Sequence, residues 1–263
     1  MGKLSDLFAQ VRRARSGKGI GFVGKNSPTL KAREAALLVE FHGTDVGNAE
    51  AAIKAGADGL IFTWDGQGNE NTDTLHSAIE AAQTANEHTL CGLHLTGGGK
   101  KLERKDFERF KELGLSFVIL PLSAPARLLS MHVKDLETIV SVPLREGELY
   151  PIFIRNLSAV EKVAAIHLDF NLSSEISNMS IEDALHYRAV REAIHAPALI
   201  HVNDTLNEDD AYALLTLGIQ AMVLAESKDA ATTGQQIAAV REILEKVHHD
   251  EKEATMIGLH SKG

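Results

Sequence analysis

The chain has 263 residues, of which 44% are hydrophobic and 24% are charged, and its mean hydropathy is −0.08. This composition excludes a disordered chain, and the length is typical of one α/β barrel domain. The formal net charge of −9 opposes contact with polyanions, so we expect neither nucleic acid nor a membrane surface as a partner. The single cysteine, Cys91, excludes an intramolecular disulfide and favours a reducing, cytoplasmic setting.

Residues 1–35 are expected to form a lead-in to the main domain. Over Leu4 to Arg15, the apolar residues fall on one helical face and the arginines elsewhere, which predicts an amphipathic helix. A short strand is expected at Gly19 to Val23. We expect this lead-in to pack across one end of the domain that follows.

Residues 36–247 alternate apolar strands with amphipathic helices. Strands are predicted from Ala36, and at Leu60–Asp65, Thr89–Leu95, Phe117–Leu122, Thr138–Val142, Ala164–Phe170, Ala198–Val202 and Ala221–Ala225. Helices are predicted at Asn48–Ala55, Asp73–Glu87, Arg104–Leu113, Ala126–Val133, Ile181–Ile194 and Gln235–His248, with another between the cap at 207–210 and Gly218. Residues 143–162 fit either an extra strand or a short helix begun by Asn156, and residues 248–263 are expected to be a frayed tail.

The predicted strands repeat in pairs. In three of the four pairs the second strand follows a similar helix end, which reads AGAD at 55–58, LGLS at 113–116 and LGIQ at 217–220. A period of two strand–helix units, roughly 50 residues, suits a barrel whose interior layers are filled by alternate strands. This spacing resembles that of the aldolase-type (β/α)8 barrel superfamily over residues 36–247. The resemblance implies a single (β/α)8 TIM barrel domain and fixes no activity.

In this fold the reaction site lies at the C-terminal ends of the strands, where side chains alternate between the interior and the helices. A charged group among the helices would be desolvated, so the polar parity set should point inward. The catalytic candidates chosen on this basis are Glu40, His167, Asp169 and Asn203, and the candidate metal ligands are His42, His94 and His201. The predicted ring also includes Thr63, Asp65, Thr96, Ser123, Ser141 and Glu226.

Imidazole and carboxylate groups from several strands support two kinds of chemistry. One is a divalent metal centre holding zinc, manganese or magnesium, and the other is acid–base catalysis in which a carboxylate tunes a histidine. A third interpretation is a purely structural layer of hydrogen-bonded polar groups. The sequence leaves all three open, although a ring of several buried polar groups needs a network or a ligand to satisfy it.

Other chemistries are disfavoured by what the rim lacks. The segments after the last two strands read NDTLNEDD and ESKDAATTG, and their carboxylates would repel the phosphate of FMN or of a phosphorylated substrate. No predicted strand contains lysine, so we expect neither a Schiff-base aldolase nor pyridoxal phosphate (PLP). The sequence favours a lyase or hydrolase acting on a small unphosphorylated carbonyl or carboxylate ligand, in a chain that could form homo-oligomers. The alternative is a non-catalytic ligand-binding or scaffolding barrel.

Overall fold

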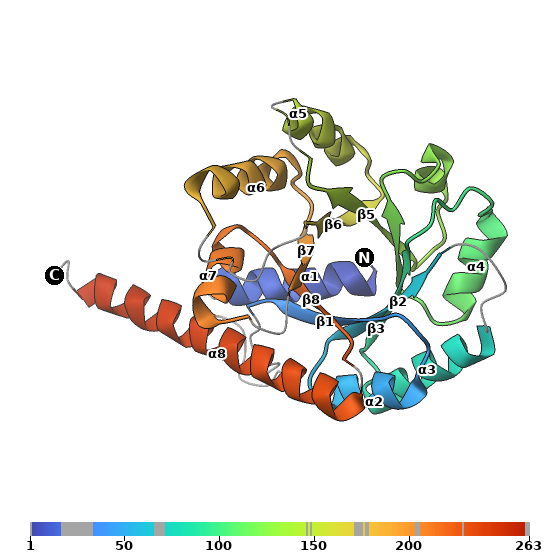
Figure 1. Cartoon of the computed structure of the whole chain (residues 1–263), viewed down its shortest axis with the longest axis horizontal. Coiled ribbons are helices and arrows are strands. Elements are labelled where there is room, and N and C mark those ends of the chain that lie inside the picture. Colours follow the sequence, from blue (N-terminus) through green and yellow to red (C-terminus); the bar gives the residue numbers. More distant parts are fainter. Residues whose placement is uncertain are drawn as a thin grey trace, which may run out of the picture.

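A computed structural model describes residues 2–16, 34–65, 72–145, 147, 149–170, 176, 179–202, 206–227 and 229–260. Within this part of the chain, eight parallel strands close into a barrel in which each strand pairs with its neighbours in sequence and β8 pairs with β1 (Figure 1). The strands are β1 (Ala36–Phe41), β2 (Gly59–Trp64), β3 (Leu90–Leu95), β4 (Phe117–Pro121), β5 (Glu137–Pro143), β6 (Val163–Asp169), β7 (Ala198–Val202) and β8 (Ala221–Ala225). The predicted (β/α)8 barrel is confirmed.

Helices surround this barrel, as Figure 1 shows. They are α2 (Val46–Lys54), α3 (Thr72–Ala85), α4 (Arg104–Glu112), α5 (Tyr150–Ile154), α6 (Ile181–Ala193), α7 (Glu208–Thr216) and α8 (Ala230–His260), with the 3-10 helices η1 (Ala126–Ser130) and η2 (Arg155–Ala159). None of the helices in the described ranges has both the length and the apolarity needed to cross a membrane.

The first helix, α1 (Lys3–Ser16), closes the N-terminal end of the barrel. Leu4, Phe8 and Val11 are fully or almost fully buried, and they belong to the same apolar cluster as the inward-facing residues of the strands. The carboxylate of Glu137, the first residue of β5, accepts hydrogen bonds from the backbone N–H groups of Leu4 and Ser5 at 2.9 and 3.3 Å. The expectation that the lead-in packs across one end is therefore confirmed for α1, whereas the strand expected at Gly19–Val23 lies outside the described residues.

Side-chain alternation divides the core into two layers. The inner cluster joins α1 to strand residues of one parity, among them Leu38, Ile61, Phe117, Ile139 and Val223. The outer cluster lies between the strands and the helices and includes Cys91, whose pKa burial raises to about 12. A thiol with so high a pKa carries almost no thiolate at neutral pH, so Cys91 is an inert, helix-facing member of the core.

The predicted repeat has a structural basis in the turns that precede the even-numbered strands. Gly56, Gly114 and Gly218 have φ values of 110°, 95° and 84°, a left-handed conformation that favours glycine. Each of their carbonyl groups accepts a hydrogen bond from a neighbouring helix, donated by Arg241 of α8, Gln83 of α3 and Arg191 of α6 respectively. The same contact therefore recurs three times around the barrel, and the described residues of the pair β5–β6 show no counterpart.

Some predicted boundaries are wrong. The stretch at Ala126–Val133 is only a 3-10 turn, and Asn156 lies inside η2 rather than at the start of a helix, because α5 begins at Tyr150. The last helix starts at Ala230, not Gln235, since Asp229 accepts a hydrogen bond from the backbone N–H of Thr232 at 2.9 Å. The predicted frayed tail is helical as far as His260.

Candidate active site

A chain of five hydrogen-bonded side chains crosses the inside of the barrel near its C-terminal end. Glu40 joins two histidines: Oε1 lies 2.6 Å from Nδ1 of His94, and Oε2 lies 2.8 Å from Nε2 of His201. Nδ1 of His201 is 2.8 Å from Nε2 of His167, and Nδ1 of His167 is 3.0 Å from Oγ of Ser141. We call these five residues the polar network.

The strand register explains why these side chains meet. Along the strand pairs, Glu40 aligns with Ile61, Thr63 with His94, and Ser141 with His167. In a barrel of eight strands with a shear of about eight, residues of neighbouring strands that lie at the same height along the barrel axis are offset by about one position from this hydrogen-bonded alignment. Glu40, His94, Ser141 and His201 therefore form one interior layer, with one residue from each odd-numbered strand.

The members of the polar network differ in their exposure. His167 lies one level deeper, among the apolar side chains of the inner cluster, and only 1% of it is exposed. The side chains of Glu40, His94 and His201 are 7%, 15% and 31% exposed, so solvent reaches the network at His94 and His201. The two histidines at Glu40 are therefore the members that a ligand could contact.

The electrostatics of the network favour an ionised Glu40. Burial alone would raise the pKa of its carboxyl group, but the hydrogen bonds and charges of His201 and His94 outweigh that cost and lower the pKa far below its ordinary value. Burial has the opposite outcome at His167, where it lowers the pKa well below 6.5; His201 and His94 add to this effect and Glu40 opposes it. Near neutral pH the network thus contains a carboxylate and an uncharged His167.

The network includes four of the seven residues that the sequence nominated as catalytic or metal-binding. Glu40, His94, His167 and His201 come together as the parity rule predicted. Ser141 is among the residues predicted to face inward, but no sequence pattern indicates that its hydroxyl group contacts His167. Strand alternation predicts which polar residues face inward without identifying their partners.

Two of the other three nominated residues, His42 and Asp169, lie outside the network. His42 follows the end of β1, where strand parity no longer applies; it is exposed, and its backbone N–H donates to Glu226 at 2.8 Å. Asp169 ends β6 and is exposed, and the described contacts include no hydrogen bond from it to the network. Its parity and height put it in the layer above Glu40, on the open side of the barrel. Asn203 lies outside the described residues.

The predicted metal centre does not fit this arrangement. Within the described residues, no group of three or more His, Cys, Asp or Glu side chains is placed to hold a metal ion. Both oxygens of Glu40 and both ring nitrogens of His201 and His167 already have hydrogen-bond partners inside the network. A divalent ion would have to break these bonds, and elemental analysis of the purified protein tests whether it binds a metal.

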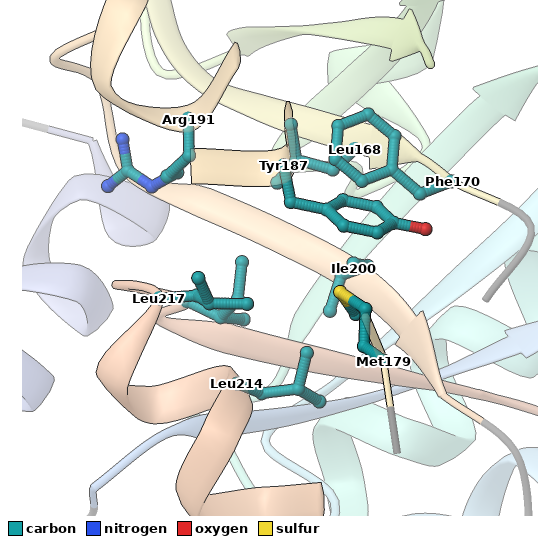
Figure 2. A pocket seen from close by; sticks show the side chains of 9 residues that line it. Leu168, Phe170, Met179, Tyr187, Arg191, Ile200, Leu214 and Leu217 are labelled. Atoms are coloured by element: carbon teal, nitrogen blue, oxygen red, sulfur yellow. The ribbon is translucent and has the colours of Figure 1, made fainter. Parts of the chain in front are cut away.

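Two depressions elsewhere do not resemble this site. Figure 2 shows an apolar gap between β6, β7, α6 and α7, lined by residues that include Phe170, Met179 and Tyr187. Its volume is about 10 Å³, about one water-sized probe and too little for a substrate. The other is an open depression of about 470 Å³ at the start of α7, beside Glu208 and Asp209. Neither is lined by a member of the polar network.

Comparison with known proteins places the fold and nothing narrower. No family model and no curated protein matches the sequence. The structure is similar to tryptophan synthase from M. tuberculosis in its open form, with a TM-score of 0.64, 11% identity, and coverage of 93% of this chain and 99% of that one. It is also similar to the HpcH/HpaI aldolase from Desulfitobacterium hafniense, with a TM-score of 0.54, 12% identity, and coverage of 80% and 92%. The chain therefore has the (β/α)8 barrel fold, and at these identities the likeness concerns the fold alone.

Proposed function

We propose that this protein is an enzyme that removes a proton from a small substrate at the mouth of the barrel, with Glu40 and His94 as its general-base pair. The supporting observation is that an ionised, buried Glu40 holds Nδ1 of His94 at 2.6 Å, while Nε2 of His94 has no hydrogen-bond partner among the described residues. A carboxylate accepts hydrogen bonds only, so Nδ1 of His94 carries the proton and Nε2 carries a lone pair.

This arrangement has the chemistry of a base. When Nε2 of His94 accepts a proton, the imidazolium that forms is stabilised by the carboxylate already bonded to its other nitrogen. His201 holds the second oxygen of Glu40, so the carboxylate cannot turn away from His94. Glu40 orients the histidine and stabilises its charge, and the histidine transfers the proton.

The charges at the rim support a carbonyl substrate. Asp169, Glu226 and the acidic start of α7 disfavour a phosphorylated substrate, and they favour a neutral carbonyl compound over a carboxylate. Removal of a proton next to a carbonyl group begins many lyase reactions, and the same base could activate water in a hydrolase. We therefore propose a lyase first and a hydrolase second.

Deuterium exchange tests the base directly. The full-length protein is incubated in deuterated buffer with a panel of small ketones, aldehydes and 2-oxo acids, and the loss of the proton beside the carbonyl group is followed by NMR. We expect exchange with at least one compound and a loss of about 10²- to 10⁴-fold in His94→Gln, the usual range for a positioned acid–base group. His88→Gln, at an exposed histidine, is the matched control. Exchange that survives His94→Gln would show that another group is the base.

One observation favours a second candidate, a non-catalytic ligand-binding or scaffolding barrel. His167, His201 and Glu40 satisfy one another, so the polar network could serve only to hold the strands in register. Under this alternative, wild type promotes no exchange with any compound of the panel, and Glu40→Gln affects stability alone.

A further inference from the structure

We infer that the ionised carboxylate of Glu40 fixes the direction of every proton between itself and Ser141, so that His201 and His167 are each held in one tautomer. Ser141 and His167 lie at the buried end of the polar network, where 5% of Ser141 and 1% of His167 are exposed. Neither of them forms a hydrogen bond with His94, although the rings of His94 and His167 meet edge to face with centroids 5.3 Å apart. His167 and Ser141 pair the ring nitrogens that point away from Glu40.

The direction follows from the acceptor at the open end. A carboxylate offers only lone pairs, so Nε2 of His201, 2.8 Å from Glu40, must carry a hydrogen. In neutral His201 the other ring nitrogen, Nδ1, then has none. It must accept, so the hydrogen in the 2.8 Å contact with His167 belongs to Nε2 of His167.

The same step applies once more and ends at the serine. Neutral His167 with a hydrogen on Nε2 has a lone pair on Nδ1, which faces Oγ of Ser141 at 3.0 Å. The hydroxyl group of Ser141 must therefore donate. The rings of His167 and His201 are held at 76° to each other with centroids 4.8 Å apart, so neither can turn over without breaking its contacts at both nitrogens. Each link in the chain permits one proton arrangement as long as Glu40 is ionised and both histidines are neutral.

This arrangement matters for Glu40. If Nδ1 of His201 carried the hydrogen, the lone pair of Nε2 would face an oxygen of Glu40, and the carboxylate would lose one of its two donors. His167 thus donates to Nδ1 of His201 and Ser141 donates to Nδ1 of His167, so each ring nitrogen that points away from Glu40 has a donor. The effect on catalysis rests on the proposed function, whereas the proton arrangement does not.

Histidine tautomers can be read from long-range ¹H–¹⁵N correlation spectra of the ¹⁵N-labelled full-length protein at about pH 8, where an unperturbed imidazole is neutral. We expect His167 and His201 to carry their hydrogen on Nε2 and His94 to carry it on Nδ1. In Glu40→Gln one oxygen is replaced by an NH2 group that donates, so His94 or His201 should change its tautomer; in Ser141→Ala, which leaves Glu40 intact, His167 and His201 should keep theirs. Substitution of each histidine by glutamine assigns the signals.

Two outcomes overturn the inference. The first is a wild-type spectrum with the hydrogen of His167 or His201 on Nδ1, a result that does not require any variant to fold. The second is a Glu40→Gln spectrum in which His94, His167 and His201 all keep the wild-type pattern. If wild type catalyses no deuterium exchange but shows the expected tautomers, the proposed function fails and this inference stands.

Discussion

Lowering the pH from 7.5 to 5.5 should destabilise the fold through His167. The folded state keeps this histidine uncharged because burial lowers its pKa well below 6.5. The unfolded state binds the proton more readily, so the contribution to stability is fully present above pH 6.5 and is lost as the pH falls below it. One unit below 6.5, a single such group costs about 1.4 kcal/mol, whereas at pH 7.5 the cost is close to zero.

The assay is urea unfolding followed by far-UV circular dichroism across this pH range. The difference in unfolding free energy between wild type and His167→Gln isolates the group from the other histidines of the chain, and His88→Gln, at an exposed position, should follow the wild-type curve. We expect the wild-type curve to fall relative to that of His167→Gln by about 1.4 kcal/mol between pH 7.5 and pH 5.5. Parallel curves would mean that folded His167 accepts the proton, which would contradict its burial among apolar side chains.

Three further predictions test the rest of the structure. Glu40 has a lowered pKa in the folded state, so it stabilises the fold above pH 4.5 and loses this effect as the pH falls. Glu40→Gln should therefore lower the free energy of unfolding by about 2 kcal/mol at pH 7. In unfolding curves recorded below pH 4.5, the difference from wild type should shrink. Gly92 faces the ring of Phe117, where an added Cβ would lie 2.1 Å from the nearest ring carbon; Gly92→Ala should therefore cost about 1–3 kcal/mol or more in chemical unfolding, while Gly98→Ala, with 4.0 Å to its nearest neighbour, should be tolerated. Arg241 pairs with the buried Asp58 and also donates to the carbonyl of Gly56, so Arg241→Ala should cost about 3 kcal/mol by the same measurement. Arg188→Ala, which breaks an exposed ion pair, is the control. A loss in Arg241→Ala no larger than in the control would show that the contacts of Arg241 contribute little to stability.

The inward-facing residues could be predicted from the sequence because strand alternation is local. Each of Glu40, His94, His167 and His201 sits inside a short apolar segment, where a polar side chain has only the interior in which to find partners. The rule is unreliable where a strand ends. His42 has the parity of Glu40, but β1 stops at Phe41, so its position is set by the turn that follows.

The pairing of those side chains could not be predicted, because it depends on how far each strand is shifted along its neighbour. The sequence offered Asp169 and Glu40 equally as partners for a histidine. The register puts Asp169 one layer above Glu40 and His167 one layer below it, so the two histidines that reach Glu40 are His94 and His201. Register is a property of the closed barrel and does not follow from any single strand.

The last helix shows a similar limit. Gly234 is a poor helix former, yet it lies inside α8. In the structure an added Cβ at Gly234 would lie 3.7 Å from Cβ of Ala55, so the glycine lies where α8 packs closely against the end of α2. A contact between helices far apart in sequence thus accompanies the glycine, whereas the helix boundary is set locally by the Asp229 cap.

The position of the polar network follows from the repeat that builds the barrel. Each pair of strands supplies one residue to the layer that contains Glu40, so any chain of this architecture has four equivalent positions there. Three of the four residues, His94, Ser141 and His201, can donate hydrogen bonds, and Glu40 can only accept them when ionised. On β8, which lies between β7 and β1, Val223 and Ala225 are small or apolar, and His201 reaches Glu40 past them. A carboxylate is thus held in its charged form by imidazoles from two sides, the state that the proposed base pair of Glu40 and His94 requires.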